Sequence, residues 1–285
     1  MKNKIVAMIL ILIFSLSILS NSALANLNNT SPNKSTLEKY YTYDELTLLL
    51  GQLKEEYPNI FDYSSLGKTW GEKDIWLVKI SDNVSIEEDE GGVLYIGGMH
   101  GDEHQGYQTV IYSIISILEN YTSVKNNESF TKYARKIVNN TQMFFIPMLN
   151  ADGCIAKTRK NFRPNGCLFG KGFMKGVDVN RNSGYKWELQ DKYPFRFRRV
   201  FPYFEKINIK FPLFDFRSII GEGCYRGPEP FSEPESQAIK HVVENYNISI
   251  YIDHHGAVPG GMIMYGWSWN HNLEYQMFLP KVHPL

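Results

Sequence analysis

The sequence predicts an α/β domain with a mixed, mostly parallel central sheet that is flanked by helices. Short apolar runs typical of strands alternate along the chain with longer segments of helical periodicity. Strands that alternate with helices favour a sheet that is covered on both faces. No internal repeat or linker divides the 285 residues, so we expect one domain over residues 36–285.

Helix and strand alternate from the start of this domain. Leucines at helical spacing predict a helix from Tyr43 to Tyr57, which Pro58 ends because proline cannot continue the hydrogen-bond ladder. The runs DIWLVKIS (74–81) and GVLYI (92–96) predict two strands. From His104 to Tyr121 the apolar residues recur at i, i+3 and i+4, which predicts a long amphipathic helix.

The second half of the chain continues the alternation. The run QMFFIPML (142–149) predicts a buried strand, in which Pro147 indicates an edge position or a bulge. Ser232 and Glu235 have the spacing of a capping box and predict a helix that runs to Tyr246. Further strands are expected at 248–253 (ISIYID) and 262–267 (MIMYGW).

Composition excludes several classes of protein. Lys+Arg 30 balance Asp+Glu 30, which argues against a nucleic-acid binder that relies on a basic surface. The hydrophobic share of 43% and the aromatic share of 14% are too high for a disordered chain. There is no second long apolar run, which excludes a membrane protein with several spans.

The first residues have the pattern of a targeting segment. Two lysines precede an apolar run from Ile5 to Leu19, and the small-x-small sequence Ala23-Leu24-Ala25 follows. We expect residues 1–25 to be a signal peptide that is cleaved after Ala25, which implies a secreted protein with a flexible leader over 26–35. The alternative is an uncleaved N-terminal membrane anchor.

Residues able to bind a metal follow two of the predicted strands. The strand at 92–96 leads into a glycine-rich turn with His100 and Glu103, and the strand at 248–253 leads into His254 and His255. Ligands of open α/β sheets bind at the carboxyl ends of the strands. Two histidines and a glutamate there would suit Zn²⁺ and leave a fourth position for water or substrate. Taken alone, His-x-x-Glu also fits a capped helix beside a surface histidine.

A third group of polar residues contains Asn180 and Arg181, in a turn that glycine follows at position 184. Arginine forms bidentate pairs with carboxylates, so an Asn-Arg pair beside a zinc ion suggests a clamp for the end of a peptide chain. The alternative is a structural arginine that holds a loop together.

Five motifs occur in a fixed order along the chain. They are His100-x-x-Glu103, Asn150-Ala151-Asp152-Gly153, Asp178-x-Asn180-Arg181-Asn182, Tyr225-Arg226-Gly227-Pro228 with Ser232-Glu233-Pro234-Glu235, and Asp253-x-His255. From about Tyr40 to Trp267 this series resembles the signature of the zinc metallocarboxypeptidases of the funnelin, or M14, type. The resemblance implies a carboxypeptidase-like α/β/α sandwich.

The resemblance also implies roles for individual residues. His100, Glu103 and His255 match the zinc ligands, with His254 on the other side of its strand. Asn180 and Arg181 match the pair that holds the substrate's C-terminal carboxylate. Arg159, which precedes Lys160, matches the arginine that polarises the scissile carbonyl, with Arg163 as the second choice and an exposed basic loop as the alternative. The implied activity is hydrolysis of the last peptide bond of a peptide or protein by a monomeric enzyme.

The cysteines are expected to divide into a pair and a single residue. Cys167 and Cys224 bracket the Asn-Arg segment as a disulfide pair does in relatives of this family, so the resemblance implies a Cys167–Cys224 bridge. Cys154 would then be left over, buried as a small apolar residue.

One segment departs from the family pattern. Residues 193–217 hold nine aromatic residues, three prolines, six basic and two acidic residues. We expect an extra hairpin that packs its aromatic face on the domain. The alternative is a cationic, aromatic rim that contacts an anionic surface or gates the site.

The general base of the family has no match in this chain. It is a glutamate several dozen residues beyond the second zinc histidine, whereas the one acid after His255 is Glu274, in a stretch that reads as a helix start. We therefore expect a carboxypeptidase domain that is incomplete at its C-terminus. The alternatives are an inactive relative that binds zinc or peptides, a site completed by another chain, and a zinc amidase or deacylase of cell-wall peptides or N-acyl amino acids.

Overall fold

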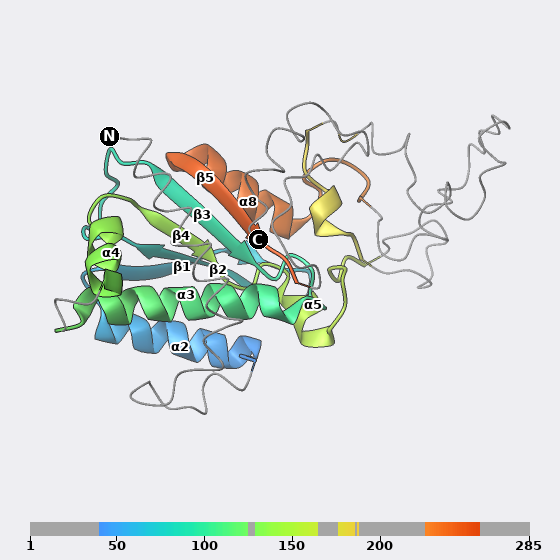
Figure 1. The fold of residues 1–285 in the computed structure, drawn as a ribbon. Coiled ribbons are helices and arrows are strands. Elements are labelled where there is room, and N and C mark those ends of the chain that lie inside the picture. The colour runs from blue at the N-terminus through green and yellow to red at the C-terminus, as the bar shows by residue number, and fades with distance from the viewer. Residues whose placement is uncertain (1–39, 125–128, 165–175, 186, 188–225, 257–285) are drawn as a thin grey trace, which may run out of the picture.

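The computed structural model describes residues 40–124, 129–164, 176–185, 187 and 226–256 (Figure 1). The elements, in chain order, are α2 (Tyr43–Glu56), β1 (Phe61–Lys68), β2 (Asp74–Ile80), β3 (Gly92–Gly97), α3 (His104–Thr122), α4 (Ser129–Val138), β4 (Met143–Ile146), α5 (Ala151–Ala156), the 3-10 turn η2 (Val179–Arg181), α8 (Pro234–Asn245) and β5 (Ile248–His254). Among the described residues, no helix is long and apolar enough to cross a membrane.

The five described strands form one mixed sheet in the order β1-β2-β4-β3-β5. The pairs β1/β2 and β2/β4 are antiparallel, whereas β3 runs parallel to both β4 and β5. The mixed α/β class predicted from the sequence is confirmed, and the parallel half of the sheet is the half that carries the candidate metal ligands.

Strand β4 lies in the middle of the sheet, so the edge position inferred from Pro147 is wrong. The strand ends at Ile146, three residues before the predicted end at Leu149. Pro147 therefore comes directly after the paired residues, where its missing backbone N–H removes no bond of the ladder.

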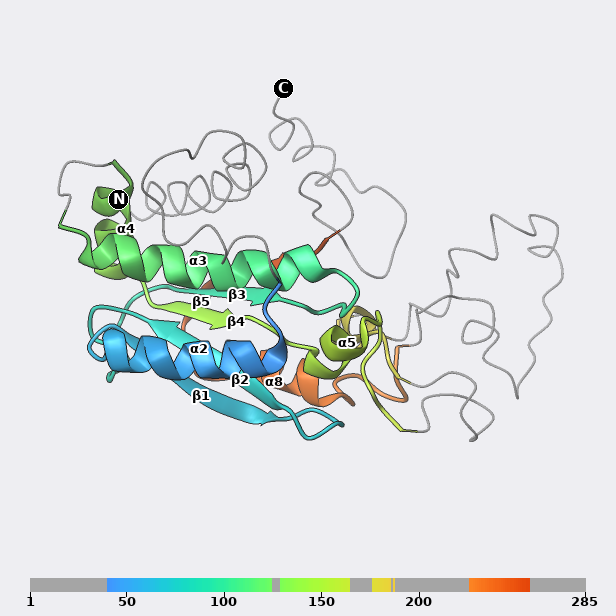
Figure 2. The same ribbon diagram turned by 90° about the horizontal axis from the view of Figure 1, so that it is seen from below.

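Helices cover both faces of the sheet, as Figures 1 and 2 show: α2, α3 and α4 lie on one face and α8 on the other. On β3, Val93 and Tyr95 pack in the core beneath α2 and α3, while Leu94 and Ile96 pack with α8. Since β3 is buried on both faces, its sequence is a continuous apolar run without polar alternation.

Helix α8 begins differently from the prediction. It starts at Pro234, and Glu233 is its N-cap without a side-chain capping bond, so the capping box of Ser232 and Glu235 is wrong. The Ser232 hydroxyl donates instead to the Glu233 carboxylate, and the Asn182 side chain accepts from the Glu233 backbone N–H at 3.1 Å. The Asn182 side chain, from another segment, thus accepts a hydrogen bond at the start of α8, where the sequence had predicted a capping bond from Ser232.

The sequence did not predict three elements, which are β1, α4 and α5, and the expected turn at Asn180 and Arg181 is the 3-10 turn η2. Several predictions fall outside the described residues. They are the signal peptide and leader (1–35), Cys167, Cys224, the aromatic segment (193–217), the strand 262–267 and Glu274.

Candidate metal centre

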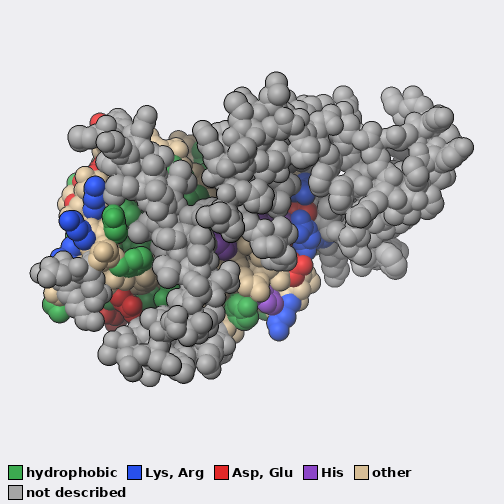
Figure 3. All heavy atoms as spheres, in the orientation of Figure 1, with side chains coloured by type: hydrophobic (Ala, Val, Ile, Leu, Met, Phe, Trp, Pro, Cys, Tyr) green, Lys and Arg blue, Asp and Glu red, His purple; other side chains and the backbone are tan. Residues whose placement is uncertain are grey.

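The ends of β3 and β5 place the predicted metal ligands at the same edge of the sheet. The two strands are parallel, with Gly97 opposite His254. The turn after β3 carries His100 and Glu103, and His255 directly follows β5. In the space-filling view, histidines and charged side chains of both signs are visible at this end of the molecule (Figure 3).

The turn that carries His100 packs against α5. The backbone N–H groups of Leu149 and Asn150 donate to the carbonyls of Gly97 and Gly98, each at 3.0 Å. Gly101 lies so close to α5 that a Cβ there would overlap backbone atoms of Gly153. The Asn150-Ala151-Asp152-Gly153 motif therefore packs against the turn that carries His100 and Glu103 and holds it in place.

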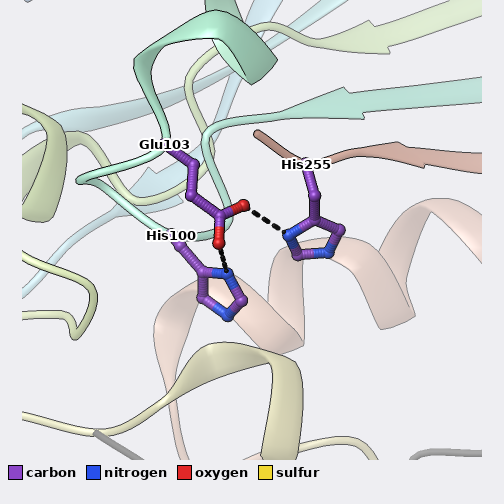
Figure 4. A group of neighbouring side chains, drawn as sticks. All are labelled: His100, Glu103 and His255. Carbon is purple, nitrogen blue, oxygen red and sulfur yellow. Dashed lines mark hydrogen bonds and ion pairs between the residues drawn. The ribbon is translucent and has the colours of Figure 1, made fainter. Parts of the chain in front are cut away.

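His100, Glu103 and His255 converge on one point. One carboxylate oxygen of Glu103 lies 2.9 Å from His100 Nδ1, and the other lies 2.8 Å from His255 Nδ1 (Figure 4). The possible ligand atoms of the three residues all lie within 4.8 Å of one another. The structure thus brings together the three residues that the sequence analysis matched to zinc ligands.

Each of the two histidines in this cluster contacts an aspartate through Nε2, on the edge of the ring that faces away from Glu103. The Nε2 atom of His100 lies 3.1 Å from Asp178, which is fully buried, and the Nε2 atom of His255 lies 2.9 Å from Asp253. A histidine that binds a metal commonly donates its other ring N–H to a carboxylate, which fixes the tautomer.

The charges of these groups stabilise one another. Burial opposes ionisation of Glu103, yet hydrogen bonds from His100 and His255 hold the pKa of this carboxyl well below its usual range. Burial also opposes protonation of His255, but its hydrogen bonds to Asp253 and Glu103 raise the pKa of the imidazole to about 10. Despite complete burial, the pKa of Asp178 falls to about 2, chiefly through its hydrogen bond with His100. In the absence of metal, protons on the imidazoles balance the carboxylates.

The donor set fits zinc. Two imidazole nitrogens and one carboxylate are the ligands that catalytic zinc sites use, with the fourth position left open. Bond lengths of about 2.0–2.2 Å in a tetrahedral site separate ligand atoms by roughly 3.3–3.6 Å. The Nδ1–carboxylate distances of 2.8 and 2.9 Å are those of hydrogen bonds, so the ligand atoms would move slightly apart around a bound ion.

Of the two candidate arginines, Arg159 lies at this cluster. Its Nε donates to Asp178 at 3.0 Å and its Nη1 to Glu103 at 3.4 Å. Arg163 instead donates to the buried Glu233 at 2.6 Å and lies over the ring of Trp70. The first choice from the sequence is thus the arginine beside the candidate metal ligands.

Asn180 and Arg181 belong to η2, which the Asp178 side chain caps. The Asn180 side-chain nitrogen lies 3.4 Å from His255 Nε2, and Arg181 donates to the Asn180 carbonyl at 3.0 Å. The pair predicted to hold a carboxylate therefore lies directly beside the metal-binding cluster.

His254 lies on the other side of its strand, as the sequence analysis expected. Its Nδ1 atom lies 3.0 Å from the Tyr95 hydroxyl, and its backbone carbonyl faces Gly106 on α3. Cys154 is buried, also as expected, and it has no disulfide partner in the part of the chain that the structure describes.

No role was predicted from the sequence for Asp178, Asp253, Asn161 or Asn182. Both aspartates were quoted within motifs, and the need of a metal-binding histidine for a carboxylate partner is the signal that could have assigned them. Asn161 donates to Glu233 and Glu235, and Asn182 holds the start of α8. No sequence pattern indicates these two contacts, because their partners lie some 50 to 70 residues away in the chain.

Comparison with known proteins agrees with this geometry. A family model described as zinc carboxypeptidase matches residues 46–281. The chain belongs to the zinc carboxypeptidase family. Within this family it is similar to a zinc carboxypeptidase of Saccharothrix mutabilis subsp. capreolus, with 29% identity over 179 residues, which are 58% of this chain and 38% of the relative. It is also similar to carboxypeptidase B of Astacus astacus, with 25% identity over 243 residues, which are 82% of this chain and 66% of the relative.

Solved structures show the same fold. Bovine thrombin-activatable fibrinolysis inhibitor, solved in complex with tick carboxypeptidase inhibitor, matches 86% of this chain and 70% of its own, with a TM-score of 0.59 and 19% identity. Carboxypeptidase A of Helicoverpa armigera matches 85% of this chain and 52% of its own, with a TM-score of 0.57 and 23% identity. The chain spans 38% of the Saccharothrix mutabilis zinc carboxypeptidase and 66% of the Astacus astacus carboxypeptidase B, which in both cases is less than two thirds of the relative's length.

Proposed function

We propose that this protein is a zinc-dependent metallocarboxypeptidase that hydrolyses the C-terminal peptide bond of peptides or proteins. The observation that carries the proposal is the juxtaposition of the His100, Glu103 and His255 cluster with Asn180 and Arg181 at one end of the sheet. Zinc held by the cluster would supply Lewis-acid chemistry, polarising a carbonyl and lowering the pKa of a bound water.

The protein's own residues position the substrate. Asn180 and Arg181 would bind the terminal carboxylate, which places the last peptide bond beside the metal ligands and makes the enzyme an exopeptidase. Arg159 would donate a hydrogen bond to the scissile carbonyl oxygen, where negative charge develops. Its hydrogen bonds to Asp178 and Glu103 hold the guanidinium beside the metal centre before substrate arrives.

Three carboxylates lie close to the cluster, and each one already contacts a histidine. Glu103 lies between both rings, Asp178 lies behind His100, and Asp253 lies behind His255. Glu103 faces both Nδ1 atoms and would itself bind the zinc ion, whereas Asp178 and Asp253 face the Nε2 edges of the rings. The proposed hydrolysis therefore requires a general base other than these three carboxylates.

This requirement favours a second candidate function, a protein that binds zinc and peptide C-termini without hydrolysing them. The two candidates share the metal centre and the carboxylate clamp. They differ in turnover, so the test of the proposal measures binding and hydrolysis separately.

The test compares peptides that have a free or an amidated C-terminus. Charge-assisted hydrogen bonds contribute about 1.5–3 kcal/mol, so we expect wild-type protein to prefer the free carboxylate by about 10- to 100-fold. Arg181→Ala should remove that preference. Lys54→Ala, which removes a positive charge from α2, is the control and should keep it.

The outcomes separate the candidates. Release of the last residue from the free peptide supports the carboxypeptidase, and binding without release supports the non-hydrolytic candidate. If Arg181→Ala weakens the action on both peptides equally, the clamp is wrong.

A further inference from the structure

The contact between His255 and Asp253 has the geometry of a support for a metal ligand. Asp253 pairs with Ile96 near the end of β5, and His255 follows two residues later. Side chains two residues apart in an extended chain lie on the same side. The Asp253 carboxylate meets His255 Nε2 at 2.9 Å, while Nδ1 of the same ring faces Glu103 at 2.8 Å.

The two contacts use opposite edges of the imidazole ring. A neutral imidazole carries one N–H donor and one acceptor nitrogen. A carboxylate accepts hydrogen bonds and repels a lone pair, so both nitrogens of His255 carry a proton while no metal is bound, Nδ1 facing Glu103 and Nε2 facing Asp253. A metal ion takes the place of the proton on Nδ1, and Asp253 keeps the proton on Nε2. The lone pair of Nδ1 is then directed at the side where Glu103 and His100 converge, which is where a metal ion would bind.

Asp253 differs from Asp178, the aspartate behind the other histidine. Asp178 also accepts bonds from Arg159 and from the backbone of Asn180, so its charge is shared among several donors. The Asp253 side chain is 13% exposed, and its second oxygen, Oδ1, is buried without a hydrogen-bond partner in the described part of the chain. A carboxylate that is largely removed from water and has few hydrogen-bond donors is costly, and the donor that Asp253 contacts is His255.

We propose that Asp253 is a positioning residue that fixes the tautomer and orientation of His255. By accepting the hydrogen bond from Nε2, it makes Nδ1 donate its lone pair more strongly to the metal ion and thereby sets the affinity of the site for zinc. This inference rests on the proposed function, because it assumes that the cluster binds zinc. It assigns Asp253 no contact with substrate.

The test measures zinc affinity by competition with a chelator, using the full chain. Loss of such a supporting partner costs about 10- to 100-fold in metal affinity. We expect Asp253→Asn, whose amide oxygen can still accept from Nε2, to lose about 10-fold, and Asp253→Ala to approach a 100-fold loss. The visible spectrum of the cobalt-substituted protein should shift in both variants. Asp62→Asn, which removes an exposed carboxylate from β1, is the matched control.

A measurement on wild-type protein avoids any effect of the variants on folding. Long-range proton–nitrogen NMR of the zinc-loaded protein should show His255 with its proton on Nε2 and zinc on Nδ1. Zinc on Nε2, or an Asp253→Ala variant with wild-type affinity and cobalt spectrum, would overturn the inference and leave the proposed function intact. Wild-type protein that binds no zinc would overturn the proposed function itself.

Discussion

At the scale of single residues, Glu103 joins the parts of the metal centre. Its two oxygens meet both imidazoles, and one of them also accepts from the backbone N–H of Gly256 at 2.9 Å. The pKa of this carboxyl is lowered and that of His255 is raised to about 10, so the metal-free cluster holds protons that zinc must displace. Metal binding at this site should therefore weaken as the pH falls.

A second buried carboxylate makes a separate prediction about stability. Glu235, at the start of α8, is fully buried and accepts a hydrogen bond from Asn161 at 2.9 Å. Burial raises its pKa to about 7, against the effect of that hydrogen bond. Because the folded state holds this proton more tightly than the unfolded state does, the contribution to stability is lost as the pH rises from about 4.5 through about 7.

Glu235→Gln keeps the shape of the protonated side chain without its titration. Relative to wild type, the variant should gain roughly 2 to 3 kcal/mol in free energy of unfolding between pH 5 and pH 8. Denaturant unfolding at the two pH values measures this difference. Glu244→Gln, on the exposed side of the same helix, should show no such gain, and an equal result for both variants would contradict the assignment of Glu235.

At the scale of elements, the turn between β3 and α3 depends on its close contact with α5. This contact leaves no room for a side chain at Gly101, where a Cβ would overlap the backbone of Gly153 and Cys154. Backbone hydrogen bonds join the two segments, so neither can move away without breaking these bonds.

Gly101→Ala should therefore destabilise the protein by at least the 1–3 kcal/mol that is typical of overpacking, and should weaken zinc binding by displacing His100. Gly51→Ala, in the middle of α2, is the control. The nearest atom to its added methyl group would lie 3.8 Å away, and alanine favours a helix by about 0.5–1 kcal/mol. Thermal unfolding of both variants checks the prediction, which fails if Gly101→Ala is as stable as wild type.

The long helices and the strands with continuous apolar runs could be predicted from the sequence, whereas shorter or more polar elements could not. The helix expected at His104–Tyr121 is α3, one residue longer, and the strand expected at 92–96 is β3. Strand β1 was missed because it lies at an edge of the described sheet and only Phe61 of its residues is fully buried. Helix α4 was missed although its apolar residues are periodic, because it is ten residues long and three of its residues, Lys132, Arg135 and Lys136, are basic.

At the scale of the whole molecule, the parallel half of the sheet explains why distant motifs form one site. The ends of β3 and β5 are adjacent, although His100 and His255 are far apart in the sequence. The order of the motifs was enough to predict the candidate ligands and the clamp. It was not enough to assign Asp178 and Asp253 to the histidines behind which they lie, because those contacts depend on the folded chain.

The most direct test of the account is a crystal structure of the zinc-loaded protein with anomalous data collected at the zinc edge. We predict one anomalous peak about 2.0–2.2 Å from His100 Nδ1, His255 Nδ1 and a Glu103 oxygen, with Asn180 and Arg181 on the open side. A zinc ion bound elsewhere, or no zinc at these three residues under saturating conditions, would contradict the account.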